Sequence, residues 1–105
     1  MKRITAHAVI QAVCQYYGLT RAEIASKSRI RKYVRPRQIA VYLIRDLCPH
    51  MSFPRTSEML GGQDHTTAIH AYQSVTRLLA RDPDIAIEVR QIQRFIMEVH
   101  QDVAA

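Results

Sequence analysis

The sequence predicts an all-α domain, and three observations lead to this prediction. Apolar residues recur at helical spacings of three and four, and no stretch alternates apolar and polar residues as a half-exposed strand would. Residues that end helices, Gly18, Pro49 and the pair Gly61-Gly62, divide the chain into helix-sized segments. The apolar fraction of 48% is that of a folded domain, and 105 residues give room for one domain.

The first two predicted helices are followed by a basic loop. A helix over residues 5–17 ends at Gly18, and a shorter helix over residues 20–27 begins with a capping box formed by Thr20 and Glu23. Residues 27–34 show no helical apolar stripe, so they are predicted to form a loop. The apolar stripe of the first helix consists of Val9, Ala12, Val13 and Tyr16.

The third and fourth helices are each expected to start near a proline. Pro36 suits the first turn of the third helix, because a proline there sacrifices no hydrogen bond. Pro49 ends this helix, and a short helix over residues 52–60 follows, with Pro54 in its first turn. The core face of the third helix consists of Ile39, Leu43 and Leu47.

A glycine pair followed by a polar helix start is the most informative feature of the chain. Gly61-Gly62 allows a turn, Asp64 can cap a new helix, and the first turn of that helix is polar. The helix continues to Arg81 with a core stripe and a separate polar face that carries no acid. With the helix before it, this forms a helix-turn-helix organisation. The stripe is Ala68, Tyr72, Val75 and Leu79, and the polar face is Thr66, His70, Gln73 and Arg77.

The last segment is predicted to form an additional amphipathic helix after the helix-turn-helix domain. We expect residues 1–81 to form that domain and residues 82–105 to form the additional C-terminal helix. This helix either packs back on the domain or mediates a homodimer through the segment Ile85–Val103. Its apolar seam consists of Ile85, Val89, Ile92, Ile96, Val99 and Val103.

The distribution of charge points to a polyanionic partner. Residues 1–45 contain ten Lys and Arg and one acid, whereas residues 46–105 contain five and eight, which together give the net charge of +6. No apolar run is long enough for a membrane helix, and no signal peptide is recognisable. Cys14 and Cys48 are therefore expected to be reduced thiols in a cytoplasmic, nucleoid-associated protein.

Two motifs in one order resemble a known family. The chain carries Arg35-Pro36-Arg37-Gln38 after the basic loop and Asp64-His65-Thr66-Thr67 after the glycine pair. This order resembles the C-terminal DNA-binding domain (domain IV) of the bacterial replication initiator DnaA, a Trp-repressor-like helix-turn-helix fold. The resemblance spans residues 4–81 and implies double-stranded DNA with an A·T-rich, TTATNCACA-type box as the partner.

The resemblance assigns DNA contacts to particular residues. It places Arg29 in the minor groove, whose narrow A·T-rich form attracts a guanidinium. It places Asp64, His65 and Thr66 on base edges in the major groove. Asp64 as a simple helix cap, and DNA roles for Lys32 and Arg35, are alternatives that stay open. Contacts to the DNA backbone are implied for Lys27, Arg31, Arg37, Arg45, Phe53, Pro54 and Thr67.

The chain also departs from the family pattern. Gln63 and Ser74 stand where the family usually carries cations, and residues 55–57 replace a more acidic and apolar stretch. Each lost phosphate contact would flatten the salt dependence of binding by about 0.9 log units. The sequence has no Gly-rich phosphate loop and no room for an ATPase domain, so we expect a stand-alone relative or an excised fragment without ATPase activity.

These observations predict a bacterial, non-enzymatic regulator of transcription or replication initiation that binds DnaA-box-like sites. No catalytic residues, metal ligands or cofactors are expected: His65 and His70 are five residues apart, unlike the usual zinc-binding pairs on helices. The alternative is a protein-interaction module that keeps the fold but binds DNA weakly or without specificity. Gln63, Ser74 and the apolar last helix motivate this alternative.

Overall fold

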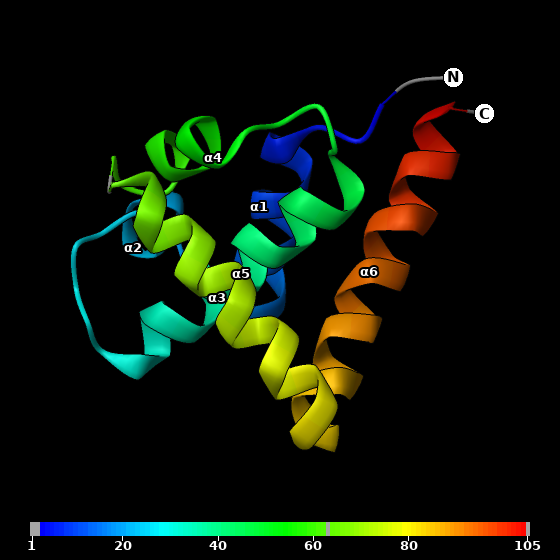
Figure 1. Ribbon diagram of the computed structural model, residues 1–105. Coiled ribbons are helices and arrows are strands. Elements are labelled where there is room, and N and C mark those ends of the chain that lie inside the picture. Colours follow the sequence, from blue (N-terminus) through cyan, green and yellow to red (C-terminus); the bar gives the residue numbers. More distant parts are fainter. Residues whose placement is uncertain (1–2, 63, 105) are drawn as a thin grey trace.

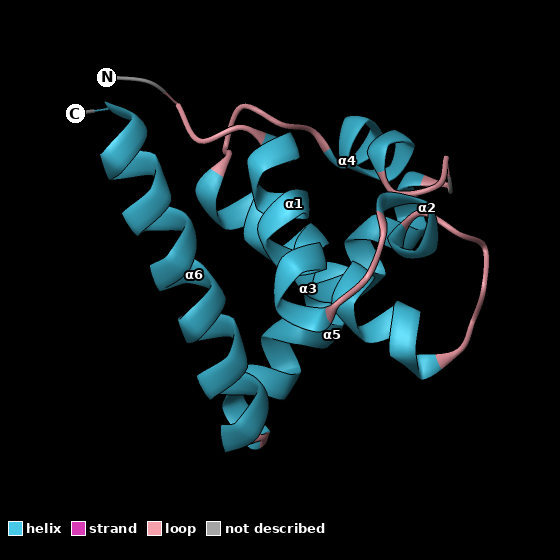
Figure 2. Ribbon diagram, turned by 180° about the vertical axis from the view of Figure 1, so that it is seen from behind, coloured by secondary structure: helices cyan, strands magenta, loops and turns pink. Residues whose placement is uncertain are grey.

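A computed structural model describes residues 3–62 and 64–104, with the side chains of residues 101–104 outside this description. Gln63 also lies outside the described residues. Within the described part, the chain forms helices joined by short connections and contains no strand, which confirms the all-α fold (Figures 1 and 2). The helices are α1 (Ala6–Tyr17), α2 (Arg21–Ile24), α3 (Arg31–Leu47), α4 (Phe53–Met59), α5 (His65–Arg81) and α6 (Pro83–Ala104).

The ends of α1 and α2 follow the capping pattern of the sequence. The Thr5 side chain accepts a hydrogen bond from the Ala8 amide, and Gly18 ends α1 in the left-handed conformation at φ 67°. Thr20 and Glu23 form the predicted capping box. α2 is shorter than expected, however, and ends at Ile24.

The predicted start of the third helix is wrong. α3 begins at Arg31, so Pro36 lies inside the helix and not in its first turn. The missing amide of Pro36 leaves the carbonyl of Lys32 without its helical donor, which costs little because Lys32 is exposed and water can donate. Tyr33 supports the early turn by donating a hydrogen bond to Glu23 at 3.2 Å. This contact between two elements could not be read from the local apolar pattern.

Helices α3, α4 and α5 form the centre of the molecule. Figure 1 shows α5 crossing in front of α3, with α4 above the start of α5. α5 packs mainly on α3 and α4, and α3 also packs on α1. Tyr72 of α5 stacks on Tyr42 of α3 at 5.3 Å between ring centroids and meets Phe53 of α4 edge-on at 6.0 Å. The expected core face of α3 is confirmed at Ile39 and Leu43, which are fully buried.

The C-terminal helix α6 packs on α1 and α5. The predicted seam is buried at Ile85, Val89, Ile92 and Ile96. It does not continue beyond them: Val99 is 45% exposed, and the Val103 side chain lies outside the described residues. Tyr16 of α1, expected in the core stripe, is also exposed and donates a hydrogen bond to Gln91 of α6.

The two cysteines are buried free thiols, as predicted. Burial raises the pKa of the Cys14 thiol and of the Cys48 thiol. No helix within the described ranges is both long and apolar enough to cross a membrane.

Candidate nucleic-acid interface

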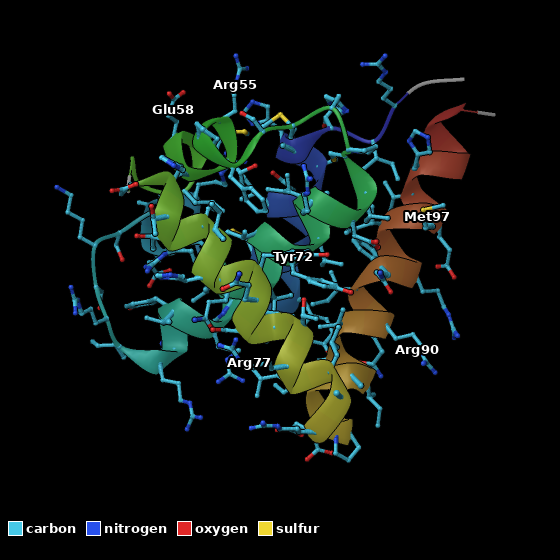
Figure 3. The ribbon with its side chains drawn as sticks, in the orientation of Figure 1. Arg55, Glu58, Tyr72, Arg77, Arg90 and Met97 are labelled. Carbon is cyan, nitrogen blue, oxygen red and sulfur yellow. The ribbon has the colours of Figure 1, made fainter. Side chains whose placement is uncertain are left out.

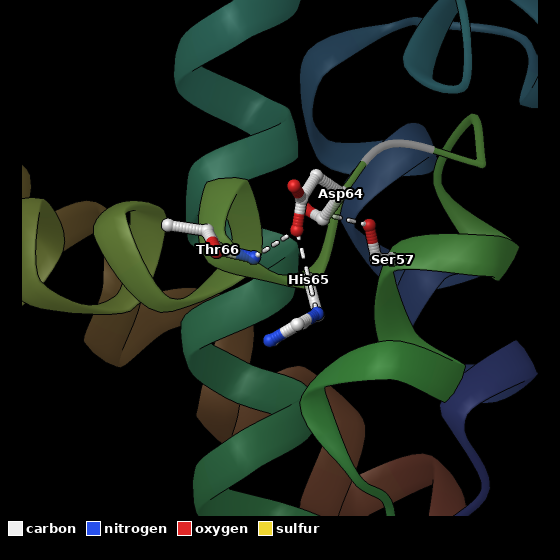
Figure 4. Close-up of polar contacts among 4 residues, drawn as sticks. All are labelled: Ser57, Asp64, His65 and Thr66. Atoms are coloured by element: carbon white, nitrogen blue, oxygen red, sulfur yellow. Dashed lines mark hydrogen bonds and ion pairs between the residues drawn. The ribbon is translucent and has the colours of Figure 1, made fainter.

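The first turn of α5 presents a row of exposed polar side chains. Asp64 caps the helix: its Oδ1 accepts a hydrogen bond from the Thr66 amide at 3.0 Å and lies 3.3 Å from Nδ1 of His65 (Figure 4). The Thr66 amide is the main cause that holds the pKa of the Asp64 carboxyl below its ordinary value. Asp64 therefore stays ionised at neutral pH, and 70% of its side chain is exposed. Asp64 thus caps α5 and still exposes most of its carboxylate to solvent.

The turn before α5 is attached to the end of α4. The Gly62 amide donates to the Ser57 carbonyl at 3.0 Å, and the Ser57 hydroxyl donates to the Asp64 carbonyl at 3.3 Å (Figure 4). Gly61 and Gly62 both have positive φ, at 115° and 69°. Ser57 is buried and holds the turn. This role could not be predicted from the sequence, because a single serine in a short helix is equally compatible with an exposed position.

The predicted polar face of α5 is confirmed as exposed. Thr66, Thr67 and His70 follow one another along the first two turns, and all are exposed. Farther along, Arg77 projects from α5 and donates to the Ser74 hydroxyl at 3.4 Å (Figure 3). The opposite side of the helix is buried at Ala68 and Val75, so α5 is anchored on one side and open on the other.

The basic loop between α2 and α3 extends away from the helices on the same side as the start of α5 (Figure 1). The loop carries the exposed side chains of Lys27 and Arg29, and the exposed Arg31 is the first residue of α3, so the loop ends earlier than the residue 34 predicted from the sequence. None of these three side chains makes a hydrogen bond or ion pair with another described residue. The loop itself is ordered by serines: Ser26 Oγ accepts from the Ser28 amide at 3.4 Å, and Ser28 Oγ accepts from the Ile30 amide at 3.2 Å. Three cations are thus presented on a locally structured backbone.

Arg37 differs from these cations because its guanidinium faces the protein. Its Nε donates to the Ile24 carbonyl at 2.7 Å, and both terminal nitrogens lie 3.3 Å from the Ser28 carbonyl. Burial lowers the pKa of Arg37. Arg35, on the same helix, has a buried Nε without a hydrogen-bond partner among the described residues. The sequence left the DNA role of Arg35 open, but it did not distinguish the inward-facing Arg37 from the exposed arginines.

Arg45, Phe53 and Pro54 lie together where α3 ends and α4 begins. The Arg45 guanidinium lies over the Phe53 ring, 5.0 Å from its centroid. This cation–π contact orients an exposed arginine without neutralising its charge. Pro54 is exposed in the first turn of α4, which is capped by the Ser52 side chain through the Arg55 amide at 3.2 Å.

Among the described side chains, those of residues 3–62 and 64–100, no group of three or more His, Cys, Asp and Glu is placed to hold a metal ion. The exposed side chains are instead donors, acceptors and cations on a helix start and a neighbouring loop. Such an arrangement suits base edges and phosphates.

An all-α domain in which a short helix and a glycine turn present an exposed polar helix start is a helix-turn-helix DNA-binding domain. Residues 6–75 match the family model described as "Bacterial dnaA protein helix-turn-helix". The chain therefore belongs to the DnaA helix-turn-helix family, and the resemblance predicted from the two motifs is confirmed.

Curated relatives agree with this assignment. The chain is 41% identical over 92 residues to the chromosomal replication initiator protein DnaA of Sphingopyxis alaskensis, and this match covers 88% of the chain and 20% of the relative. It is 36% identical over 97 residues to the protein of the same name from Rhizobium meliloti, covering 92% of the chain and 20% of the relative. The chain thus spans about a fifth of the length of these relatives.

Proposed function

We propose that this chain binds double-stranded DNA in a sequence-specific manner at DnaA-box-like sites. The observation that carries the proposal is that two exposed polar elements, the basic loop and the first turn of α5, lie on one side of the molecule (Figure 1). Family membership supports DNA binding as the general activity. The chain would act as a regulator of transcription or replication initiation without ATPase activity, in the cytoplasm and associated with the nucleoid.

The basic loop is proposed to contact the minor groove. Arg29 is exposed and unpaired within the described chain, so its guanidinium is available for a narrow A·T-rich groove. Lys27 and Arg31 flank it and would bind phosphates on either side. Because phosphate contacts fix the position of the protein but carry no sequence information, Arg29 is the loop residue that contributes to specificity.

The start of α5 is proposed to contact bases in the major groove. Asp64 is ionised, and its carboxylate would accept a hydrogen bond from a cytosine amino group. His65 has two ring nitrogens that can donate or accept, and the Thr66 methyl group would pack on a thymine methyl group. Thr67, in the same turn, would donate to a phosphate.

The junction of α3 and α4 is proposed to bind the DNA backbone. Arg45 supplies the charge, already oriented over Phe53, and Pro54 brings the start of α4 against the sugar-phosphate chain. The guanidinium of Arg37 already donates to the Ile24 and Ser28 carbonyls, so Arg37 would contribute little to phosphate binding.

The test is a binding titration of the 105-residue chain with two fluorescent duplexes, one that contains a TTATNCACA-type box and one with the same bases scrambled. At each of two salt concentrations we expect tighter binding to the box. The logarithm of the affinity for both duplexes should fall with the logarithm of the salt concentration, by about 0.9 for each phosphate contact. Equal affinity for the two duplexes at moderate salt would reject sequence-specific binding.

A protein-interaction role is the second candidate, and the exposed apolar side chains of α6 favour it. Phe95 and Val99, which are exposed, line a hollow of about 520 Å³ between α6 and the start of α1. Met97 and Ile87 are exposed on the same helix. Because the buried seam is already used by α1 and α5, a homodimer through Ile85–Val103 would have to use these exposed residues. Sedimentation at increasing protein concentration tests for it, and a constant monomer mass would reject it.

A further inference from the structure

The basic loop and the turn before α5 touch where Gly61 packs against Ala25. Ala25 follows α2 directly, at the root of the loop. A Cβ atom at Gly61 would lie 2.5 Å from the Ala25 carbonyl oxygen, closer than the 3.0 Å that real Cβ atoms keep from their neighbours. Gly61 is therefore required for a close approach of two backbone segments, in addition to its positive φ. At Gly62, by contrast, a Cβ atom would meet nothing within 4 Å.

Arg37 attaches the loop to α3 next to this contact. One planar guanidinium donates to the Ile24 carbonyl, at the end of α2, and to the Ser28 carbonyl, directly before Arg29. A lysine at this position has a single nitrogen and cannot bond both carbonyls with the same geometry. The backbone that carries Arg29 is thus fixed by a side chain of α3.

A continuous series of contacts therefore joins the two DNA-contacting elements. On one side, Arg37 holds the loop around Ser28. In the middle, Ala25 meets Gly61. On the other side, Ser57 bonds the Gly62 amide and the Asp64 carbonyl, which fixes the cap of α5.

We propose that Gly61 and Arg37 are positioning residues that set the distance between the minor-groove loop and the major-groove helix, and so determine how strongly the protein prefers its own DNA site. The proposal rests on the DNA-binding function proposed above. Its physical reason is that the two grooves of a duplex have a fixed separation. Once α5 is bound in the major groove, the loop has a high effective concentration at the minor groove only if the distance between loop and α5 matches the distance between the two grooves.

The first test uses the free protein and compares Gly61→Ala with Gly62→Ala. Both variants place a side chain at a positive φ, but only the first meets the Ala25 carbonyl. In amide NMR spectra, Gly61→Ala should shift the resonances of residues 25–30, and Gly62→Ala should leave them in place. A folded Gly61→Ala variant with unchanged resonances at 25–30 would overturn the proposal, and this result does not depend on DNA binding.

The second test is a double-mutant cycle with the box duplex. Arg29→Ala should weaken binding by about tenfold in the wild-type and Gly62→Ala proteins, and clearly less in Gly61→Ala, where the loop is already displaced. An equal loss in all three proteins would overturn the positioning role while DNA binding itself stands. If the wild-type protein binds the box duplex no more tightly than the scrambled duplex, both the proposed function and this proposal are rejected.

Arg37→Lys gives a separate test, which also serves if Gly61→Ala does not fold. The variant keeps the charge but loses the two-carbonyl attachment. We expect faster amide hydrogen exchange in residues 26–30 and a smaller ratio of box to scrambled affinity, with an unchanged salt dependence. If Arg37 acts only as a charge that binds phosphate, amide hydrogen exchange in residues 26–30 should be unchanged in Arg37→Lys. That result would overturn its positioning role.

Discussion

Tyr17 of α1 donates a hydrogen bond to Glu88 of α6, with 3.1 Å between the phenol oxygen and Oε1. The two residues are far apart in sequence, and their bond joins the C-terminal helix to the first helix. Burial, followed by the charge of Glu88, raises the pKa of Tyr17 above its ordinary value. The contact makes α6 part of the domain rather than an independent tail.

Tyr17→Phe should lower the free energy of unfolding by about 1 kcal/mol, because it removes this half-buried hydrogen bond and leaves Glu88 without its donor. The matched control is Tyr16→Phe, which removes an exposed bond to Gln91 and should cost less. Urea unfolding followed by circular dichroism measures both. Equal effects of the two variants would show that the Tyr17 bond is not protected from water.

Alkaline pH should destabilise the protein in part through Tyr17. The unfolded chain releases the phenol proton near pH 10, whereas the folded chain holds it to a higher pH, so the folded state binds more protons. The contribution of Tyr17 is complete below pH 10 and is lost as pH rises above it. Through Tyr17, the free energy of unfolding falls by at most about 1.4 kcal/mol per pH unit. The difference in unfolding free energy between wild type and Tyr17→Phe should be constant from pH 8 to about pH 10 and should shrink between about pH 10 and pH 11, by no more than this slope.

His65→Ala should weaken binding to the box duplex by about 1–3 kcal/mol and binding to the scrambled duplex much less. The reason is that His65 is exposed in the first turn of α5 and its main contact in the protein is with Asp64. His7→Ala on α1 is the control and should bind both duplexes as wild type does. A loss of equal size on both duplexes would remove His65 from the base-contacting residues.

Arg45→Met should weaken binding to both duplexes equally and flatten the salt dependence by about 0.9 log units, because it deletes a charge that is proposed to bind one phosphate. Arg90→Met is the matched control, since Arg90 projects from the outer side of α6 (Figure 3). Titrations at several salt concentrations measure both slopes. A loss confined to the box duplex would instead place Arg45 on a base.

Ile96→Ala should cost about 2–5 kcal/mol of unfolding free energy, because Ile96 is almost fully buried in the seam between α6 and the domain. The neighbouring Met97 is exposed and projects outward (Figure 3), so Met97→Ala should change stability by no more than about 0.5 kcal/mol. Chemical unfolding compares them directly. Similar small effects would mean that α6 contributes little to the fold.

Most helix boundaries could be predicted because they depend on local chemistry. The capping box at Thr20 and the cap at Asp64 act within a few residues, and the structure reproduces both. The start of α3 could not be predicted, because it depends on Tyr33 reaching Glu23 of a different element. Likewise, the burial of the α6 seam ends at Ile96, where the helix leaves the surface that covers it, although the apolar pattern continues to Val99.

In the candidate interface, too, local features could be predicted from the sequence, whereas contacts between elements could not. The residue types at Asp64, His65 and Thr66 identify the polar helix start, and the structure places all three in the open. The direction of an arginine is not encoded in its residue type: Arg29 faces solvent and Arg37 faces Ile24 and Ser28. The contact between Gly61 and Ala25 was also invisible, because a glycine required for close packing looks the same in a sequence as one required for a turn.

The two buried thiols have a practical consequence. Cys48 is fully buried, and its Sγ donates to the Ile4 carbonyl at 3.1 Å. Cys14 is also buried, and both thiols are poor nucleophiles because their pKa values are raised. The sequence contains no other cysteine. Neither cysteine of the folded chain therefore offers a surface thiol for oxidation in air, so a dimer of folded chains would not be held by a disulfide. A thiol reagent modifies only molecules in which α1 or the end of α3 has opened, and its rate reports how often they do.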